Sequence, residues 1–579
     1  MKWLERVFII DGYVDEPTCL GVPPYLATYP RYVAGSIWTR LPHAEIIYQT
    51  IDAVRKNPAA SIEAWTSADL LVLIAGMIVP GKYLGGNPIS VREAQEIFSA
   101  GLISNIAKIL VGPWARFGCG LEGGKQALHP DVLSPPFDSI VDGDAGAVLD
   151  EYLTENTHPK ELDPTRKRED YEKFEESVIR GTHIVTQHPG YPQKHLICEI
   201  ETYSGCPRYL SGGCSFCVEP LQGSPKQRSV DAILQEIESL YQQGIRAFRI
   251  GNQPDLFTYG SQEMSVEEFP KPSPDTIERL FSGIRSVAPT LEVLHVDNIN
   301  PGTIAHHPEE SRSIAKTIVK HHTPGDVAAF GVESFDPRVV KENNLKASGD
   351  EIIEAVRILN EVGAKRMGRG LPHLLPGINL LYGLPGERTQ TIEYNMDYLL
   401  RILQEGLVLR RINIRQVIQI PGTRASGMDK SKLDQHEFYR HKRKVRENID
   451  LPMIKRVAPQ GTVIHSAFVE TQRGKNVLLR TLGTYPLLCH MPNGRHHDTR
   501  MDLVVVDHGP RSLTVLPYPI RPEKMSLRQW SAIPGIGTKR AARLKIASGS
   551  KNHWAIRESV DMEMPVWLID SLSTDACES

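Results

Sequence analysis

Short apolar runs that end at Gly or Pro alternate with helix-capable segments along the first 150 residues. The runs span residues 5–12, 69–76, 107–113 and, more weakly, 138–143, and residues 91–106 form one of the helix-capable stretches between them. Strands that alternate with helices favour a parallel, doubly wound sheet, whose ligands bind beyond the carboxyl ends of the strands. We therefore predict an α/β ligand-binding domain over residues 1–150.

The alternation lapses over residues 151–190 and then resumes. Residues 151–190 are highly charged, which predicts a linker with some helix on a solvated surface. Six apolar runs, the first of them LICEIE at 196–201, then alternate with helical segments as far as residue 425. This second series predicts a partial or full (β/α) barrel over residues 191–425.

The last part of the chain changes character again. Residues 426–525 predict a helical connector followed by a small β-rich domain, a barrel of OB-like size. Residues 526–579 contain PGIGT between two helix-capable segments, which resembles a helix-hairpin-helix. Backbone N–H groups of such a hairpin can bind a phosphate, with Lys539, Arg540 and Arg543 beside it. The alternative is that the hairpin packs against its own protein.

Composition narrows the setting in which the protein works. The net charge of −3 over 579 residues gives no global attraction to nucleic acid or to an acidic membrane. No stretch approaches the roughly 20 apolar residues of a membrane span, and the first residues do not form a signal peptide. Eight cysteines are too sparse for a disulfide framework, so we expect a cytoplasmic protein that uses thiolates as ligands.

Three of the cysteines cluster with the spacing C-x7-C-x2-C, directly after the first predicted barrel strand: Cys206, Cys214 and Cys217. A structural zinc site usually takes four protein ligands, and His195 and Cys198 are the nearest further candidates. Three thiolates can instead hold three irons of a [4Fe–4S] cluster and leave the fourth iron open to a small molecule. We favour the cluster and keep zinc as the alternative.

The cysteine motif, with Phe216 between its last two cysteines, resembles the radical S-adenosylmethionine (SAM) superfamily, whose usual spacing is C-x3-C-x2-C. The later segments RIGNQPD, HVDN, GVES, YGLPGE and IPGTRA resemble further motifs of that superfamily in the same order. The resemblance implies a [4Fe–4S] cluster, SAM and an electron donor. It also implies SAM contacts at Phe216, Gly251, Asn252, Gln253, Asp255, Asp297, Glu333, Ser334, Gly383 and Leu384.

A doubly wound domain directly before such a core resembles the cobalamin-binding domain of B12-dependent radical SAM enzymes. The D-x-H-x-x-G motif of other B12 proteins is absent, as is normal in this subclass. The resemblance implies that cobalamin contacts Gly12, Tyr13, Pro24, Tyr25, Gly76, Met77, Gly112, Pro113 and Gly143. The alternative is a Rossmann-like domain that has lost its B12 pocket.

Along nearly its whole length the chain resembles a mainly archaeal group of radical SAM proteins with a C-terminal helix-hairpin-helix. That resemblance implies C-methylation of an unactivated carbon as a post-translational modification, with a glutamine of methyl-coenzyme M reductase as the suspected target. The cofactors, rather than side-chain acids and bases, are expected to carry the chemistry. Two alternatives remain: an RNA-modifying methylthio- or methyltransferase that binds RNA through the barrel and hairpin, and a binding protein with a structural cluster.

Overall fold

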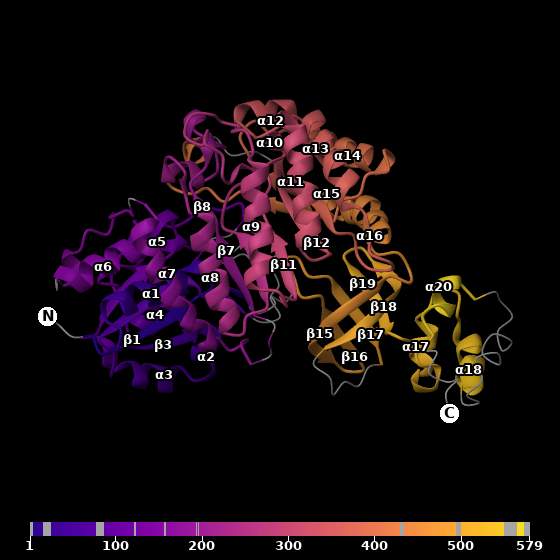
Figure 1. Ribbon diagram of the computed structural model, residues 1–579, viewed down its shortest axis with the longest axis horizontal. Coiled ribbons are helices and arrows are strands. Elements are labelled where there is room, and N and C mark those ends of the chain that lie inside the picture. The colour runs from indigo at the N-terminus through magenta and orange to yellow at the C-terminus, as the bar shows by residue number, and fades with distance from the viewer. Residues whose placement is uncertain are drawn as a thin grey trace.

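The computed structural model describes residues 4–14, 25–76, 86–120, 123–155, 158–168, 170–192, 194, 196–428, 434–493, 500–548 and 564–572. An N-terminal α/β domain lies at one end, a larger α/β core follows, and a small β-barrel and short helices form the other end (Figure 1). Within those residues no helix has both the length and the apolar character that crossing a membrane requires.

The N-terminal domain is built on a five-stranded parallel sheet in the order β3-β1-β4-β5-β6. Alternate residues of β1 pack into apolar clusters on opposite faces, Ile9 on the side of α1 and Phe8 on the side of α3. This confirms the predicted parallel α/β sheet. The strands are β1 (Arg6–Asp11), β3 (Glu45–Thr50), β4 (Leu70–Ile74), β5 (Ala107–Val111) and β6 (Ser139–Ile140).

Helices connect these strands and cover both faces of the sheet (Figure 1). They are α1 (Thr28–Arg40), α2 (Ile51–Lys56), α3 (Pro58–Trp65), α4 (Val91–Phe98), α5 (Pro113–Phe117) and α6 (Ala145–Glu155). The edge strand β3 was not predicted. Its exposed edge tolerates the polar residues in EIIYQT, so the sequence lacks the continuous apolar run of the central strands.

The segment predicted as a charged linker packs against α1. It contains α7 (Glu175–Gly181), whose Ser177, Val178 and Gly181 are buried, while Glu176 is exposed and Glu175 pairs with the buried Arg228. A side chain at Gly181 would lie 1.9 Å from the Arg31 carbonyl oxygen, so the two helix backbones are in direct contact. The high charge of the segment therefore describes one face of a packed helix.

The core is a curved parallel sheet of six strands with helices outside it. Its strands are β7 (Ile197–Glu201), β10 (Ala247–Gly251), β11 (Val293–Val296), β12 (Asp326–Glu333), β13 (Leu374–Tyr382) and β14 (Arg411–Gln416). A bridge between Asn298 and Ala329 joins the first three strands to the last three. A short strand from the N-terminal region, β2 (Tyr25–Leu26), pairs with β7 and extends the core sheet.

Helices alternate with these strands as predicted for a partial barrel. They are α8 (Val230–Gln242), α9 (Pro274–Val287), α10 (Pro301–His306), α11 (Pro308–His321), α12 (Pro337–Glu342), α13 (Gly349–Gly363) and α14 (Thr389–Gln404). After β14 the chain continues through α15 (Gln435–Val445), one π-helical turn and α16 (Leu451–Val457). A two-stranded ribbon, β8 (Tyr203–Ser204) and β9 (Lys226–Gln227), flanks the cysteine loop.

The C-terminal part contains the small barrel that the sequence predicts. Five strands close in the order β15-β16-β17-β19-β18, with β17 and β19 parallel. They are β15 (Val463–Arg473), β16 (Asn476–Arg480), β17 (Leu488–Pro492), β18 (Arg500–Gly509) and β19 (Ser512–Pro517).

Short helices follow the barrel: α17 (Leu527–Ser531), α18 (Thr538–Ala547) and α20 (Val566–Ile569). Trp530 and Leu544 pack with Val504 and Leu516 of the barrel in one apolar cluster. The pair α17–α18 therefore packs on its own protein, and phosphate binding by a helix-hairpin-helix stays a prediction.

Candidate functional site

The cysteine loop follows β7 at the carboxyl end of the core strands. Two other segments hold it in place. The Ser215 N–H donates to the Asn343 carbonyl oxygen over 3.0 Å, and the Ala425 N–H donates to the Ser215 carbonyl oxygen over 2.8 Å. The segment 421–426, which the sequence predicts to close the barrel, therefore contacts the loop after the first strand. This end of a (β/α) barrel is where active sites lie.

Two of the three cysteines share one apolar cluster with predicted SAM residues. Cys214 and Cys217 pack there with Phe216 and Leu384, and the neighbouring Gly383 has a positive φ of 92°. Burial raises the pKa of the half-buried Cys206 to about 12 and also raises that of Cys217. A thiol must lose its proton to bind a metal, so a positive charge nearby would favour ligation.

Lys346 supplies such a charge, and the sequence analysis did not identify it. Burial acts to lower its pKa, but the charges of the three cysteines and of Glu333 raise it above the usual value. A Cβ atom at Gly331 would lie 2.5 Å from Lys346 Nζ and 2.9 Å from Glu333 Oε1, so both groups approach the same point beside β12. Burial raises the pKa of Glu333 to about 7, and Lys346 opposes that shift. No local motif marks this lysine.

These residues fit a [4Fe–4S] cluster by their chemistry. The three cysteines can ligate iron as thiolates, and the positive charge of Lys346 partly compensates their negative charges. Across the described ranges, no three Cys, His, Asp or Glu side chains converge as the ligands of a single metal ion do. Cysteines that hold an iron–sulfur cluster bind different irons, so they need not converge on one point.

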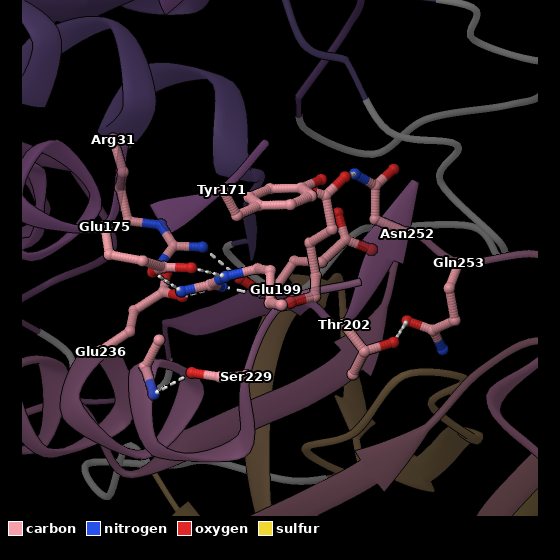
Figure 2. Close-up of polar contacts among 12 residues, drawn as sticks. Arg31, Tyr171, Glu175, Glu199, Thr202, Ser229, Glu236, Asn252 and Gln253 are labelled. Carbon is pink, nitrogen blue, oxygen red and sulfur yellow. Dashed lines mark hydrogen bonds and ion pairs between the residues drawn. The ribbon is translucent and has the colours of Figure 1, made fainter. Parts of the chain in front are cut away.

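The motif after β10 bonds the end of the first core strand. Asn252 has a positive φ of 58° and donates through Nδ2 to Glu201 Oε1 over 2.9 Å, while the Tyr171 hydroxyl donates to Glu201 Oε2 over 2.7 Å (Figure 2). Gln253 accepts from the Thr202 hydroxyl over 3.3 Å (Figure 2). Asn252 and Gln253 therefore contact consecutive residues at the carboxyl end of β7.

Asp255 and Ser334, two further predicted SAM residues, bond to other segments of the core. Asp255 Oδ2 accepts from the Thr303 hydroxyl over 2.7 Å, and its Oδ1 accepts the backbone N–H groups of Phe257 and Asn300. Ser334 Oγ accepts from the Asp336 N–H over 3.2 Å and donates to Asn395 Oδ1 over 3.4 Å. Both side chains are buried, and these bonds give each of them a structural role. A SAM contact at either residue stays a prediction.

Asp297 lies inside the core, where a loop of the small barrel reaches it. It accepts from Arg249 of β10 and from the hydroxyl of Tyr485, which belongs to the β16–β17 loop. The same loop places the Thr484 N–H 3.2 Å from His295 Nδ1 and packs Leu482 against the amino-end residues of β7, β10 and β11. The small barrel therefore covers the amino end of the core. Sequence reasoning missed this contact because it joins residues 188 positions apart.

Most of the predicted cobalamin residues that the structure describes lie at the carboxyl edge of the N-terminal sheet, just after the neighbouring strands β1, β4, β5 and β6. A Cβ atom on any of four predicted glycines would lie 2.1–2.7 Å from another part of the chain, which gives these glycines a packing role: Gly12, Gly76, Gly112 and Gly143. The Tyr13 hydroxyl donates to Asp52, Tyr25 lies in the core sheet under Arg249, and Pro113 begins α5. Pro24 and Met77 lie outside the described residues.

A cavity of about 110 Å³ lies between the N-terminal domain and the core. Tyr29 and Arg116 line it on the N-terminal side, and Glu201 lines it at the end of β7. It also brings together Gly143, a predicted cobalamin residue, and Asn252, a predicted SAM residue. A group bound at the carboxyl edge of the N-terminal sheet would face the core across this space.

Comparison with known proteins supplies a family. The radical SAM superfamily matches residues 200–399. "Uncharacterized protein MJ0274" of Methanocaldococcus jannaschii is 45% identical over 518 residues, which cover 88% of this chain and 92% of the relative. An uncharacterized protein of Archaeoglobus fulgidus is 40% identical over 551 residues, covering 94% of this chain and 96% of the relative. Both alignments extend far beyond the matched domain.

Two kinds of more distant match include proteins whose function is known. The tRNA-2-methylthio-N(6)-dimethylallyladenosine synthase of Treponema pallidum is 22% identical over 348 residues, covering 57% of this chain and 68% of the relative. The methyltransferase TsrM from Kitasatospora setae, solved with cobalamin and a [4Fe-4S] cluster, aligns at 14% identity and a TM-score of 0.45, covering 73% of this chain and 74% of TsrM. OxsB, solved with aqua-cobalamin and SAM, aligns at 13% identity and a TM-score of 0.48, covering 77% and 56%.

Proposed function

Because the chain belongs to one family with these archaeal relatives and carries a radical SAM domain, we propose that it is a cobalamin-dependent radical SAM C-methyltransferase. The observation that carries the proposal is the position of the three cysteines. They follow the first core strand inside the matched region, together with Phe216 and Lys346. The carbon that receives the methyl group is expected to be unactivated.

The residues of the chain have distinct roles in this proposal. Cys206, Cys214 and Cys217 hold the cluster, and Lys346 balances negative charge beside it. The apolar contacts of Phe216 and Leu384 shield that site from water. When bound, the cluster and SAM supply radical hydrogen abstraction, and cobalamin supplies the methyl donor.

Cobalamin binding is supported by the architecture of the chain, whereas the cluster is supported by specific side chains. The architectural support is the doubly wound domain before the core and the cavity that joins Gly143 to Asn252. Tyr29, Tyr32 and Arg116 are the described side chains that would line a bound corrin.

The visible spectrum of the anaerobically purified protein tests both cofactors at once. We expect iron–sulfur absorbance that changes on reduction, together with cobalamin bands. Alanine at Cys206, Cys214 or Cys217 removes the iron–sulfur absorbance, whereas alanine at Cys198, on β7 and outside the loop, preserves it. If all three loop variants keep the absorbance, the cluster assignment is wrong. If only the cobalamin bands are missing, the enzyme is a radical SAM protein without B12.

A protein is the first substrate candidate, and its support is the resemblance of the whole architecture. We propose a glutamine of methyl-coenzyme M reductase as its target, with a separate protein as electron donor. Incubation of the reduced enzyme and SAM with the unmodified reductase tests this by mass spectrometry. One added methylene on a glutamine-containing peptide supports the candidate, and an unchanged peptide alongside active SAM cleavage rejects it.

RNA is the second substrate candidate, because a specific observation favours it. The chain is similar over 348 residues to a tRNA-modifying enzyme, and its C-terminal part contains a small closed barrel. Small barrels of this kind bind oligonucleotides in other proteins.

A further inference from the structure

Cationic side chains gather along the free edge of the core sheet. Among the described residues, β14 is the last strand of the sheet and pairs with β13 on one side. Arg411 and Arg415 lie on one face of β14 because side chains alternate along a strand. Helix α15 runs beside this strand, and Lys442 Nζ donates to the Ile414 carbonyl oxygen over 3.2 Å.

Lys442 belongs to a group of four positive charges. Burial and the charges of Arg446, Arg511 and Arg415 lower its pKa to about 8. Arg446 lies one helical turn after Lys442, and its own pKa is lowered by burial and by Arg511. Like charges repel, so this arrangement costs free energy in the free protein unless an anion joins it.

One carboxylate faces the group. Asp450 lies beside Arg446, Arg511 and Arg411, and burial raises its pKa to about 7. Its charge is therefore weakened near neutral pH. Glu447, on the same helix, is exposed.

The small barrel contributes to the same surface. Arg511 lies in the turn between β18 and β19, the fourth and fifth strands of the barrel. The turn between its first and second strands, at the other end of β15, carries the exposed residues Arg473 and Lys475. In OB-type barrels these two turns contact oligonucleotides.

An exposed aromatic side chain lies next to these cations. Tyr439 is 61% exposed on α15. Lys442, Arg443 and Arg446 follow it by three, four and seven residues, so they occupy neighbouring positions on the helix surface. An exposed ring beside cations offers a stacking platform for a base, and such stacking is sequence-tolerant.

We infer that Arg415, Lys442, Arg446 and Arg511 form a phosphate-binding seam between the core and the small barrel, which takes the backbone of single-stranded RNA with Tyr439 as a stacking platform. The inference rests on the second substrate candidate above and names the surface that would hold it. An acidic polypeptide offers negative charge as well, but it has no bases to stack on Tyr439. Because the whole chain has a net charge of −3, we expect the attraction for RNA phosphates to come from this seam and not from the protein as a whole.

Fluorescence anisotropy of the full anaerobic protein tests the seam. The probes are a labelled oligouridylate of about twelve nucleotides and unfractionated tRNA, titrated between about 50 and about 200 mM salt. The test variant combines Lys442→Gln, Arg446→Gln and Arg511→Gln. The matched control combines Arg92→Gln, Arg180→Gln and Arg357→Gln, which removes three positive charges that already have carboxylate partners.

We expect the test variant to bind RNA at least about tenfold more weakly at low salt. The slope of the logarithm of the binding constant against the logarithm of the salt concentration should become shallower by about two, because each lost phosphate contact contributes about 0.7. The control is expected to match the wild type. If the triple variant does not fold, Arg511→Gln alone, on an exposed turn, should still lower the slope by about 0.7.

Three outcomes overturn the inference: equal salt slopes for test variant and wild type, no binding of either RNA by the wild type, or equal competition by polyglutamate at matched charge. SAM cleavage, measured on the same samples without RNA, reports separately on the radical SAM site. Active cleavage with no RNA binding rejects the seam alone, whereas RNA binding without cleavage rejects the proposed enzyme activity alone.

Discussion

A buried ion network joins the N-terminal domain to the core, and its central carboxylate is the most informative residue to change. Glu236 on α8 accepts from Arg31 of α1 through Oε1 and from Arg228 through Oε2, the latter over 2.6 Å (Figure 2). Arg31 also donates to the Glu199 carbonyl oxygen, and Arg228 also pairs with Glu175. Glu236→Gln keeps the shape of the side chain and removes its charge.

The cost of this change follows from the burial of all three side chains. The side chains of Arg31, Arg228 and Glu236 are 0% exposed, so water cannot replace the lost charge. A glutamine has one acceptor oxygen, so its amide NH₂ would face a guanidinium donor. Removing one partner of a buried ion pair costs about 3–5 kcal/mol. This corresponds to an opening equilibrium that is roughly 100- to 4,000-fold more favourable.

Hydrogen–deuterium exchange measures that opening locally, which suits a multidomain chain that does not unfold in one step. We expect the amides of α1 to exchange faster by that factor in Glu236→Gln, with the amides of β15–β19 unchanged. Adding Arg31→Met should restore part of the protection, because it removes the guanidinium that lost its partner while Arg228 keeps Glu175.

Glu176→Gln is the matched control. Glu176 pairs with Arg180 on the surface of α7, with both side chains at least 43% exposed, so its loss should change exchange by about twofold at most. An α1 exchange rate in Glu236→Gln that rises less than tenfold would refute the reasoning. The network would then contribute no more than a surface pair does.

Three further predictions concern the core. Lys346→Met should lower the reduction potential of the cluster by roughly 60 mV, about 1.4 kcal/mol for one electron, because it removes a nearby cation. The control is Lys341→Met, which changes an exposed lysine. An EPR redox titration in which Lys346→Met shifts the potential no more than this control contradicts the prediction. Tyr485→Phe removes the hydroxyl that bonds Asp297 and should speed exchange in the β16–β17 loop by an amount equivalent to about 1–3 kcal/mol; unchanged exchange there argues against the bond. Burial lowers the pKa of His441 to about 4, so the unfolded chain binds a proton below about pH 6.5 that the folded chain does not. The wild type should therefore lose its stability advantage over His441→Gln as pH falls, by about 1.4 kcal/mol per pH unit between about 6 and 5. A difference in α15 amide exchange between the two proteins that stays constant with pH rejects this.

The elements with strong local signals were predicted from the sequence. Buried parallel strands must be apolar along their length, so β1, β4, β5 and the six core strands were visible as runs ending in turns. The five-stranded barrel was visible for a related reason, since its short strands alternate with turn residues. The cysteine loop was recognisable because cluster ligands must lie close together and the chain brings them within twelve residues.

Other features depend on contacts between distant residues, which leave no periodic trace. The edge strand β3 tolerates polar residues, and β2 is two residues long, so neither has an apolar run. Lys346 reaches the cysteines because α12 ends beside their loop, and Tyr485 reaches Asp297 because the small barrel docks on the core. The sequence alone therefore determined the order of the elements and the spacing of the predicted cluster ligands, since both depend on neighbours along the chain. Only the tertiary structure decided which charges surround those ligands and how the domains meet, since side chains from separate elements become neighbours only when the sheets pack.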